Sequence, residues 1–88
     1  MTKQGNYLVR IHKTEFFSEE DADIIIEIGE NYIRFDIEDY IEYEKYVDIP
    51  VIDWSKDHAI DFAQEISKKI KSCKVELLKA KFVHIKYF

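Results

Sequence analysis

Acidic residues recur at regular intervals in one stretch of this 88-residue chain, IRFDIEDYIEYEKY, which covers residues 33–46. Four of its acids occupy even-numbered positions, so an extended chain would carry them on one side. These are Asp36, Glu38, Glu42 and Glu44. Regularly spaced carboxylates can imitate the phosphate backbone of nucleic acid, whose charge dominates its binding to proteins. The chemistry that this pattern favours is electrostatic binding of a basic partner.

A second row of acids lies on a segment whose apolar residues have helical spacing. Asp57, Asp61 and Glu65 are four residues apart, which is about 6 Å along a helix. Tyrosines in the first stretch would add rigid, amphipathic contact area, which is common at interface hot spots. The sequence therefore predicts one set of partner-binding residues: Asp36, Glu38, Tyr40, Glu42, Tyr43, Glu44, Tyr46, Asp57, Asp61 and Glu65.

Each half of this pattern also has an ordinary explanation. Acids solvate the outer surface of most proteins, and tyrosines at this spacing pack in many sheets and loops. Like charges four residues apart on a helix are also unfavourable, by roughly 0.2–0.5 kcal/mol per pair. The sequence alone leaves open whether the acids of residues 36–44 and those of the helix share one face.

The charges of the chain are segregated, although its formal net charge is only −5. Residues 15–65 hold 17 of the 18 acids and have a local charge of −14, whereas residues 1–14 carry +3 and residues 66–88 carry +6. An acidic block of this size repels nucleic acid and membrane surfaces and attracts basic proteins. We therefore expect no direct nucleic-acid binding. The C-terminal lysines would also permit head-to-tail association between copies, so a homo-oligomer is an alternative.

No motif for catalysis or for nucleotide binding is present in the sequence. With only Gly5 and Gly29, the chain lacks the closely spaced glycines that cradle a phosphate. Cys73 falls on the apolar face of the predicted helix, where a thiol is inert. Carboxylate pairs for acid–base chemistry are abundant, but none is distinguished by its context. The sequence predicts that the chain is not an enzyme and needs no cofactor.

The three histidines do not have the spacing of a metal site. His58 with its neighbouring acids offers fewer ligands than a closed tetrahedral set requires. His12 and His84 would form a two-histidine site only if their strands paired with the side chains facing each other. A strand histidine on a polar face is the simpler prediction, so we expect no bound metal.

The composition indicates a small globular protein with a single domain over residues 1–88. Apolar residues make up 47% of the chain, which is too many for a disordered segment. The single cysteine and the absence of an apolar leader at the N-terminus predict a cytoplasmic protein. No apolar run approaches the length of about 20 residues that a membrane span needs.

Residue periodicity predicts the elements that position these side chains. Residues 6–14 alternate as a half-buried strand does, and the acidic residues 18–23 are expected to form a loop. Residues 23–37 have large apolar residues on alternate positions on both sides of a Gly-Glu-Asn turn at 29–31, which predicts a β-hairpin. Residues 40–46 fit an extended segment or one short helical turn. Residues 47–52, which include Pro50, are expected to be an edge strand or a loop.

The C-terminal half predicts a helix over about residues 55–72, followed by strand-forming residues. Asp53 or Ser55 can cap the helix, and its apolar residues step by three and four. Residues 75–87 read as one long bent strand or as two strands broken near Ala80. The predicted fold class is α+β: a small antiparallel sheet of about 4–6 strands with one amphipathic helix packed on one face.

The sequence as a whole predicts a small acidic protein-binding module. Inhibitors, immunity proteins and antagonists that mimic DNA use such surfaces to cover a basic partner, for example a nuclease or another nucleic-acid-binding protein. The alternative is a structural or assembly subunit that self-associates through its acidic centre and its basic C-terminal end. A metal-dependent enzyme would be a third reading, and it requires the histidines to converge with acids.

Overall fold

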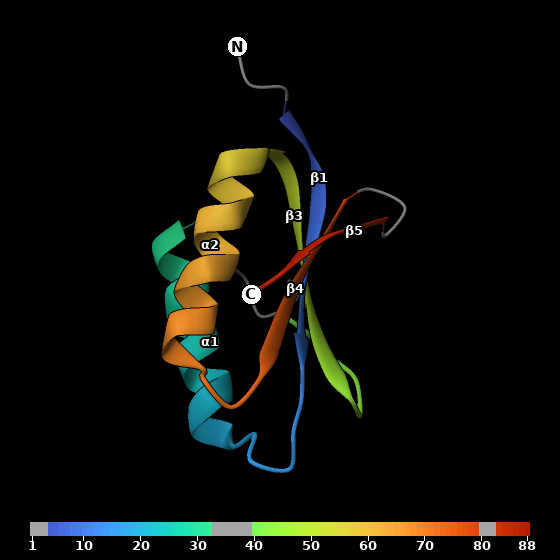
Figure 1. The fold of residues 1–88 in the computed structure, drawn as a ribbon. Coiled ribbons are helices and arrows are strands. Elements are labelled where there is room, and N and C mark those ends of the chain that lie inside the picture. The colour runs from blue at the N-terminus through green and yellow to red at the C-terminus, as the bar shows by residue number, and fades with distance from the viewer. Residues whose placement is uncertain (1–3, 33–39, 80–82) are drawn as a thin grey trace.

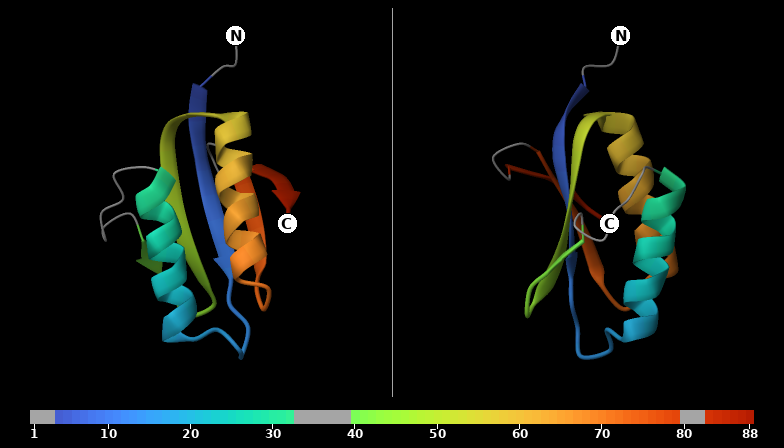
Figure 2. Two further views of the ribbon diagram at one scale, coloured as in Figure 1. Left: turned by 90° about the vertical axis from the view of Figure 1, so that its left-hand side faces the viewer. Right: turned by 180° about the vertical axis from the view of Figure 1, so that it is seen from behind.

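The computed structural model describes residues 4–32, 40–79 and 83–88, which form a curled antiparallel sheet with two helices on one of its faces (Figure 1). Figure 2 shows both helices on the same side of the sheet, running in opposite directions. The predicted α+β class, with a helix packed on an antiparallel sheet, is confirmed. The elements are β1 (Gln4–His12), α1 (Glu19–Tyr32), β2 (Ile41–Glu42), β3 (Tyr46–Ser55), α2 (Lys56–Lys69), β4 (Lys74–Lys79) and β5 (Val83–Tyr87).

The sheet has the strand order β2-β3-β1-β4-β5, with every neighbouring pair antiparallel. β1 therefore lies in the middle, and β3 and β4 run in the same direction on either side of it. α2 connects these two parallel strands across β1. The first four strands and the two helices thus have the β-α-β-β-α-β connectivity of ferredoxin-like, split βαβ arrangements. Such a connectivity is compatible with many functions.

The hydrophobic core lies between the sheet and the two helices. Alternate residues of β1, including Val9 and Ile11, are fully buried on the helix side, and Val75 and Leu77 of β4 lie beside them. Phe62 of α2 is the largest fully buried side chain among the residues that the structure describes. Its position in the middle of the helix makes α2 the element that closes the core over β1.

α2 confirms the predicted helix. Ser55 is the N-cap, and its hydroxyl accepts a hydrogen bond from the backbone N–H of His58 at 3.2 Å. Lysines in the last turn interact favourably with the negative end of the helix dipole. The helix ends at Lys69, three residues before the expected end. The predicted apolar stripe is buried: Ala59, Ala63, Ile66, Ile70 and Cys73.

The prediction of a loop at residues 18–23 and of a β-hairpin after it is wrong, because residues 19–32 form α1. Ser18 and Asp21 exchange reciprocal contacts at the start of this helix, with their backbone N–H groups 3.1 and 3.4 Å from the partner's side-chain oxygen. Ile25 and Ile28 are then buried on one side at helical spacing. The predicted return strand falls on residues 33–37, which lie outside the described residues.

The other predicted strands are confirmed with sharper boundaries. Residues 6–12 lie within β1, and of the two alternatives for residues 40–46 the extended one holds at Ile41–Glu42. Residues 47–52 belong to β3, which lies between β2 and β1, so the expected edge position is wrong, although only Val47 and Asp48 pair with β2. Pro50 pairs with Leu8 of β1 beyond the end of that short ladder. The C-terminal residues form two strands, β4 and β5, rather than one.

Neither described helix has the length and apolar character required to cross a membrane.

Replacement of Phe62 by alanine tests the role of α2 in closing the core. Because this ring is fully buried, Phe62→Ala should lower the free energy of unfolding by about 3–5 kcal/mol in urea denaturation. Phe16, which is 72% exposed, provides the control, and Phe16→Ala should change stability by no more than about 0.5 kcal/mol. Equal effects of the two substitutions would contradict this account of the core.

Candidate protein-binding surface

The β2–β3 connection and the residues on either side of it carry four of the ten predicted partner-binding residues, and Lys13, the residue after β1, anchors this turn. Lys13 donates from Nζ to a Glu42 carboxylate oxygen and to the Tyr43 carbonyl oxygen, each at 2.7 Å. The Lys13 backbone N–H donates to the Lys45 carbonyl at 2.9 Å. The Glu42 side chain nevertheless stays 55% exposed, and Glu44 is exposed as well. The turn therefore presents its carboxylates from a fixed position.

Two tyrosines of this connection stack, and they differ in exposure. The rings of Tyr43 and Tyr46 have centroids 4.7 Å apart. Tyr46 in turn lies against the guanidinium of Arg10, at 4.2 Å from its ring centroid. Tyr46 is partly buried by this contact, whereas Tyr43 is 46% exposed. Tyr43 is thus the tyrosine of this pair that is available to a partner.

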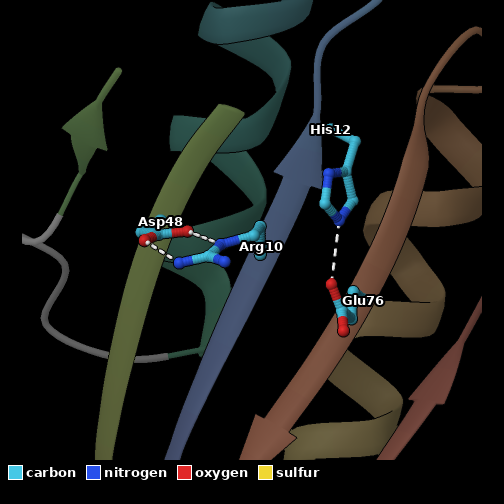
Figure 3. A network of polar contacts seen from close by, with 4 residues as sticks. All are labelled: Arg10, His12, Asp48 and Glu76. Carbon is cyan, nitrogen blue, oxygen red and sulfur yellow. Dashed lines mark hydrogen bonds and ion pairs between the residues drawn. The ribbon is translucent and has the colours of Figure 1, made fainter. Parts of the chain in front are cut away.

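A polar network lies on the helix-free face of the sheet (Figure 3), and its Arg10 side chain contacts Tyr46. Arg10 donates from two nitrogens to the two carboxylate oxygens of Asp48, at 2.8 and 3.0 Å. Asp48 is only 6% exposed. Its hydrogen bond is the main cause that raises the pKa of Arg10 above the usual value. Such bidentate pairs combine strength with a fixed geometry.

The second half of this network joins β1 to β4. His12 Nε2 lies 2.8 Å from a carboxylate oxygen of Glu76, which is 7% exposed (Figure 3). The His12 ring also lies near that of Tyr87, with centroids 6.4 Å apart. The prediction of a strand histidine on a polar face is therefore confirmed for His12. Sequence reasoning missed its partner because only the β1–β4 register brings residues 12 and 76 together.

The histidines do not assemble a metal site in the part of the chain that the structure describes. β4 separates β1 from β5, so the strands of His12 and His84 are not neighbours and the two-histidine site does not arise by strand pairing. No three His, Cys, Asp or Glu side chains in the described ranges converge as ligands would. Cys73 is a buried free thiol of the core.

Tyr40 lies beneath the acidic residues rather than among them. Its ring packs against the core, and its hydroxyl is buried with no hydrogen-bond partner among the described residues. The pKa of Tyr40 is raised to about 12, mainly by burial and in addition by the nearby carboxylates of Glu42 and Asp23. Since both acids act on one hydroxyl, the β2–β3 connection and α1 present their charges close together.

α1 carries the densest acidic charge of the structure, with six acids and neither lysine nor arginine in its 14 residues. Four of them form one stripe, because positions 20, 23, 27 and 30 are three, seven and ten residues apart. This stripe lies opposite the buried face of Ile25 and Ile28, and its members are exposed: Glu20, Asp23, Glu27 and Glu30. The sequence pattern had predicted a loop and a hairpin at these acids instead of a helix.

Two grooves join the acids of α1 to the predicted binding residues. Glu19 lines a groove of about 520 Å³ together with Glu42 and Glu44. Glu27 lines a second groove, of about 610 Å³, together with Glu65 of α2. The acids of the β2–β3 connection and those of α2 are therefore linked through α1. We call this set the acidic surface: Glu19, Glu20, Asp23, Glu27, Glu30, Glu42, Glu44, Asp61 and Glu65.

The remaining predicted residues are placed as follows. Asp61 and Glu65 act together on Tyr32, whose pKa they raise after the larger effect of burial. Asp57 is exposed in the first turn of α2. Asp36 and Glu38 lie outside the described residues, so their assignment to the binding set stays a prediction.

Comparison with known proteins identifies no relative of this chain. No family model matches it, and no curated protein or solved structure does either. The geometry and charge described above are therefore the guides to its function.

Substitution of Arg10 by lysine tests the network that contacts Tyr46. Lysine cannot make the bidentate contact to Asp48 and stack on a ring at the same time. Arg10→Lys should lower the free energy of unfolding by about 1–2 kcal/mol, as measured by urea denaturation. Lys68→Arg, at an exposed position of α2, should stay within about 0.5 kcal/mol of the wild type. An Arg10→Lys protein as stable as that control would show that the pair contributes nothing.

The buried hydroxyl of Tyr40 gives stability a defined dependence on pH. Tyr40 ionises near 10 when the chain is unfolded and near 12 when it is folded, so the folded state disfavours the phenolate. The wild type should therefore lose stability as pH rises from 10 towards 12. Tyr40→Phe should be more stable by up to about 1 kcal/mol at neutral pH, because it removes an unpaired buried hydroxyl. Its advantage should grow between pH 10 and 12.

Urea denaturation across this pH range makes the comparison. Tyr43→Phe serves as the control because it removes an exposed hydroxyl and leaves Tyr40 unchanged. A constant difference between the wild type and Tyr40→Phe at all pH values would rule out the effect.

Proposed function

We propose that this chain is a protein-binding module whose acidic surface covers the basic working surface of a partner, such as a nuclease or another nucleic-acid-binding protein. The observation that carries the proposal is the exposed stripe of four acids on α1, together with Glu19 of the same helix, which lines one groove with Glu42 and Glu44. A helix with six acids and no cation repels nucleic acid and attracts cationic proteins. In this role the chain would act as an inhibitor or an immunity-type antagonist.

The energetics of α1 support a role for its charge in binding. Like charges three or four residues apart destabilise a helix by roughly 0.2–0.5 kcal/mol per pair. Glu30 also lies near the negative end of the helix dipole, where an acid is unfavourable. These costs reduce the stability of the isolated chain. Cations from a partner would reduce the repulsion between these acids. This reduction would contribute favourably to the free energy of binding.

Exposed aromatic side chains beside the acidic surface would supply the anchoring that charge alone does not provide. Phe16 is 72% exposed in the connection between β1 and α1, and Tyr43 is 46% exposed in the β2–β3 connection. Neighbouring residues of both connections line the same groove. Aromatic residues that become desolvated are frequent hot spots of protein interfaces. Long-range charge would then set the rate of association, and these rings would slow dissociation.

Loss of two acids should reduce capture of a partner that the wild type retains. Glu20→Gln with Glu44→Gln removes two charges from the acidic surface, and it should weaken binding and lower the association rate. A matched control, Ile52→Lys with Ser72→Lys, changes the net charge by the same +2 at positions outside that surface. Each protein is used as bait in nuclease-treated lysate of the source cell at low and high salt, with mass spectrometry of the captured proteins.

The expected result is a basic protein that the wild type and the control retain at low salt and release at high salt. Equal retention by the Glu20→Gln, Glu44→Gln protein would contradict the proposal. Recovery of the bait alone, with a salt-sensitive oligomer in sedimentation, would favour the assembly subunit that self-associates through its acidic centre and basic C-terminal end.

A further inference from the structure

The groove between the two helices combines an apolar floor with acidic walls. It has a volume of about 610 Å³ and lies where α1 and α2 run side by side in opposite directions (Figure 2). Its lining residues are Ile24, Glu27, Ile28, Asn31, Tyr32, Glu65 and Lys69. Two carboxylates, one ammonium group, one amide, two isoleucine side chains and one tyrosine ring therefore surround a space that is open to a partner.

Helical spacing explains this combination. Ile24, Ile28 and Tyr32 are four residues apart, so they form one row along α1. Ile28 is buried and forms the floor, whereas Ile24 and Tyr32 keep part of their surface exposed. Glu27 belongs to the neighbouring row of α1. On the opposite wall Glu65 and Lys69 are again four residues apart, along α2.

Tyr32 packs against the core with one part of its ring and lines the groove with another part. Its ring centroid lies 5.1 Å from that of Phe62 and 5.5 Å from that of His58. Its hydroxyl donates to the Asp61 carbonyl at 3.4 Å. Burial is the main cause that raises its pKa, and the nearby carboxylates of Glu65 and Asp61 add to this effect. The Tyr32 ring is thus fixed at one end of the groove, close to the negative charges of Glu65 and Asp61.

We propose that this groove receives an arginine side chain from a basic protein partner, with the stem on the apolar floor and the guanidinium between Tyr32, Glu27 and Glu65. This inference rests on the proposed function and specifies how the acidic surface selects its partner. The two carboxylates favour a cation, and the isoleucines favour its aliphatic stem. Arginine is the residue that satisfies both and that also stacks on an aromatic ring.

Arginine should be preferred over lysine at this position for geometric reasons. The planar guanidinium donates several hydrogen bonds at once and is more weakly hydrated than an ammonium group. The chain already contains the same combination within its sheet, where Arg10 stacks on Tyr46 and binds Asp48 through two nitrogens. That internal example shows the arrangement that the groove would reproduce with a partner.

Lys69 gives the groove an internal control. As the one cation among the lining residues, it repels an incoming guanidinium at one end. Its removal should therefore strengthen binding, while removal of either carboxylate should weaken it. A structural role in packing the two helices would not produce opposite signs for these changes.

The test compares nona-arginine and nona-lysine peptides, each labelled with a fluorophore, by anisotropy at low and high salt. The wild type should bind nona-arginine about fivefold more tightly than nona-lysine, the equivalent of roughly one cation–π contact. Tyr32→Leu should remove this preference, whereas Tyr32→Phe, which retains the ring, should keep it. Urea denaturation of each variant verifies that it is folded under the conditions of the assay.

Charge variants complete the test. Glu27→Gln and Glu65→Gln should lower the preference for nona-arginine over nona-lysine. Glu20→Gln should lower the affinity for both peptides equally, because Glu20 lies on α1 outside the groove. Lys69→Gln should increase the affinity for nona-arginine. Equal binding of both peptides by the wild type would overturn the arginine groove and leave the proposed function standing. Binding of neither peptide at low salt would overturn both.

Discussion

The central strand β1 is the constraint on which the rest of the structure depends. It pairs with β3 on one side and β4 on the other, and its alternating side chains serve both faces of the sheet. Val9 and Ile11 contribute to the core beneath the helices, while Arg10 and His12 hold the two buried carboxylates on the opposite face. The next residue, Lys13, ties down the β2–β3 connection. One strand thereby fixes the core, the polar network and the acidic turn.

The different roles of the two helices, core packing for α2 and the acidic surface for α1, follow from this arrangement. α2 spans the parallel strands β3 and β4 and buries Phe62 over β1, so its sequence is determined mainly by packing. α1 buries only a narrow face, formed by Ile25, Ile28 and Gly29. Ile24, Ile26 and Tyr32 pack partly against the core beside that face, and the remaining side of the helix carries the acids. The helix that contributes less to the core is thus the one on which a charged binding surface can form at little structural cost.

The sequence predicted those parts of the fold whose pattern allows one reading. The apolar stripe of α2 has a three- and four-residue period that a strand cannot bury, and it was assigned correctly. In α1, the isoleucines at positions 24, 25, 26 and 28 fit both a strand and a helix. The β-branched residues and the Gly-Glu-Asn sequence favoured a hairpin, but burial of Ile25 and Ile28 against the core decided for the helix. The Ser18–Asp21 capping pair was the local signal that could have shown this.

The candidate site was predictable in its chemistry but not in its geometry. Composition indicated an acidic surface, and Glu42, Tyr43 and Glu44 are indeed exposed at one turn. The contribution of α1 required the correct helix, and the burial of Tyr40 required the tertiary packing. The pairs Arg10–Asp48 and His12–Glu76 depend on strand register, which pairs residues 38 and 64 positions apart. No local pattern reports such a register.

This long-range register also has a consequence for how the protein folds. β1 is among the first segments of the chain, yet both of its neighbours lie far along the sequence, and β4 follows only after α2. Chains dominated by such distant pairings fold slowly, because the entropy of closing long loops is lost before the contacts form. During synthesis on the ribosome, both edges of β1 would stay unpaired until β3 had been synthesised. The charged side chains at the end of this strand, Arg10 and Lys13, would then protect it from association with other extended chains.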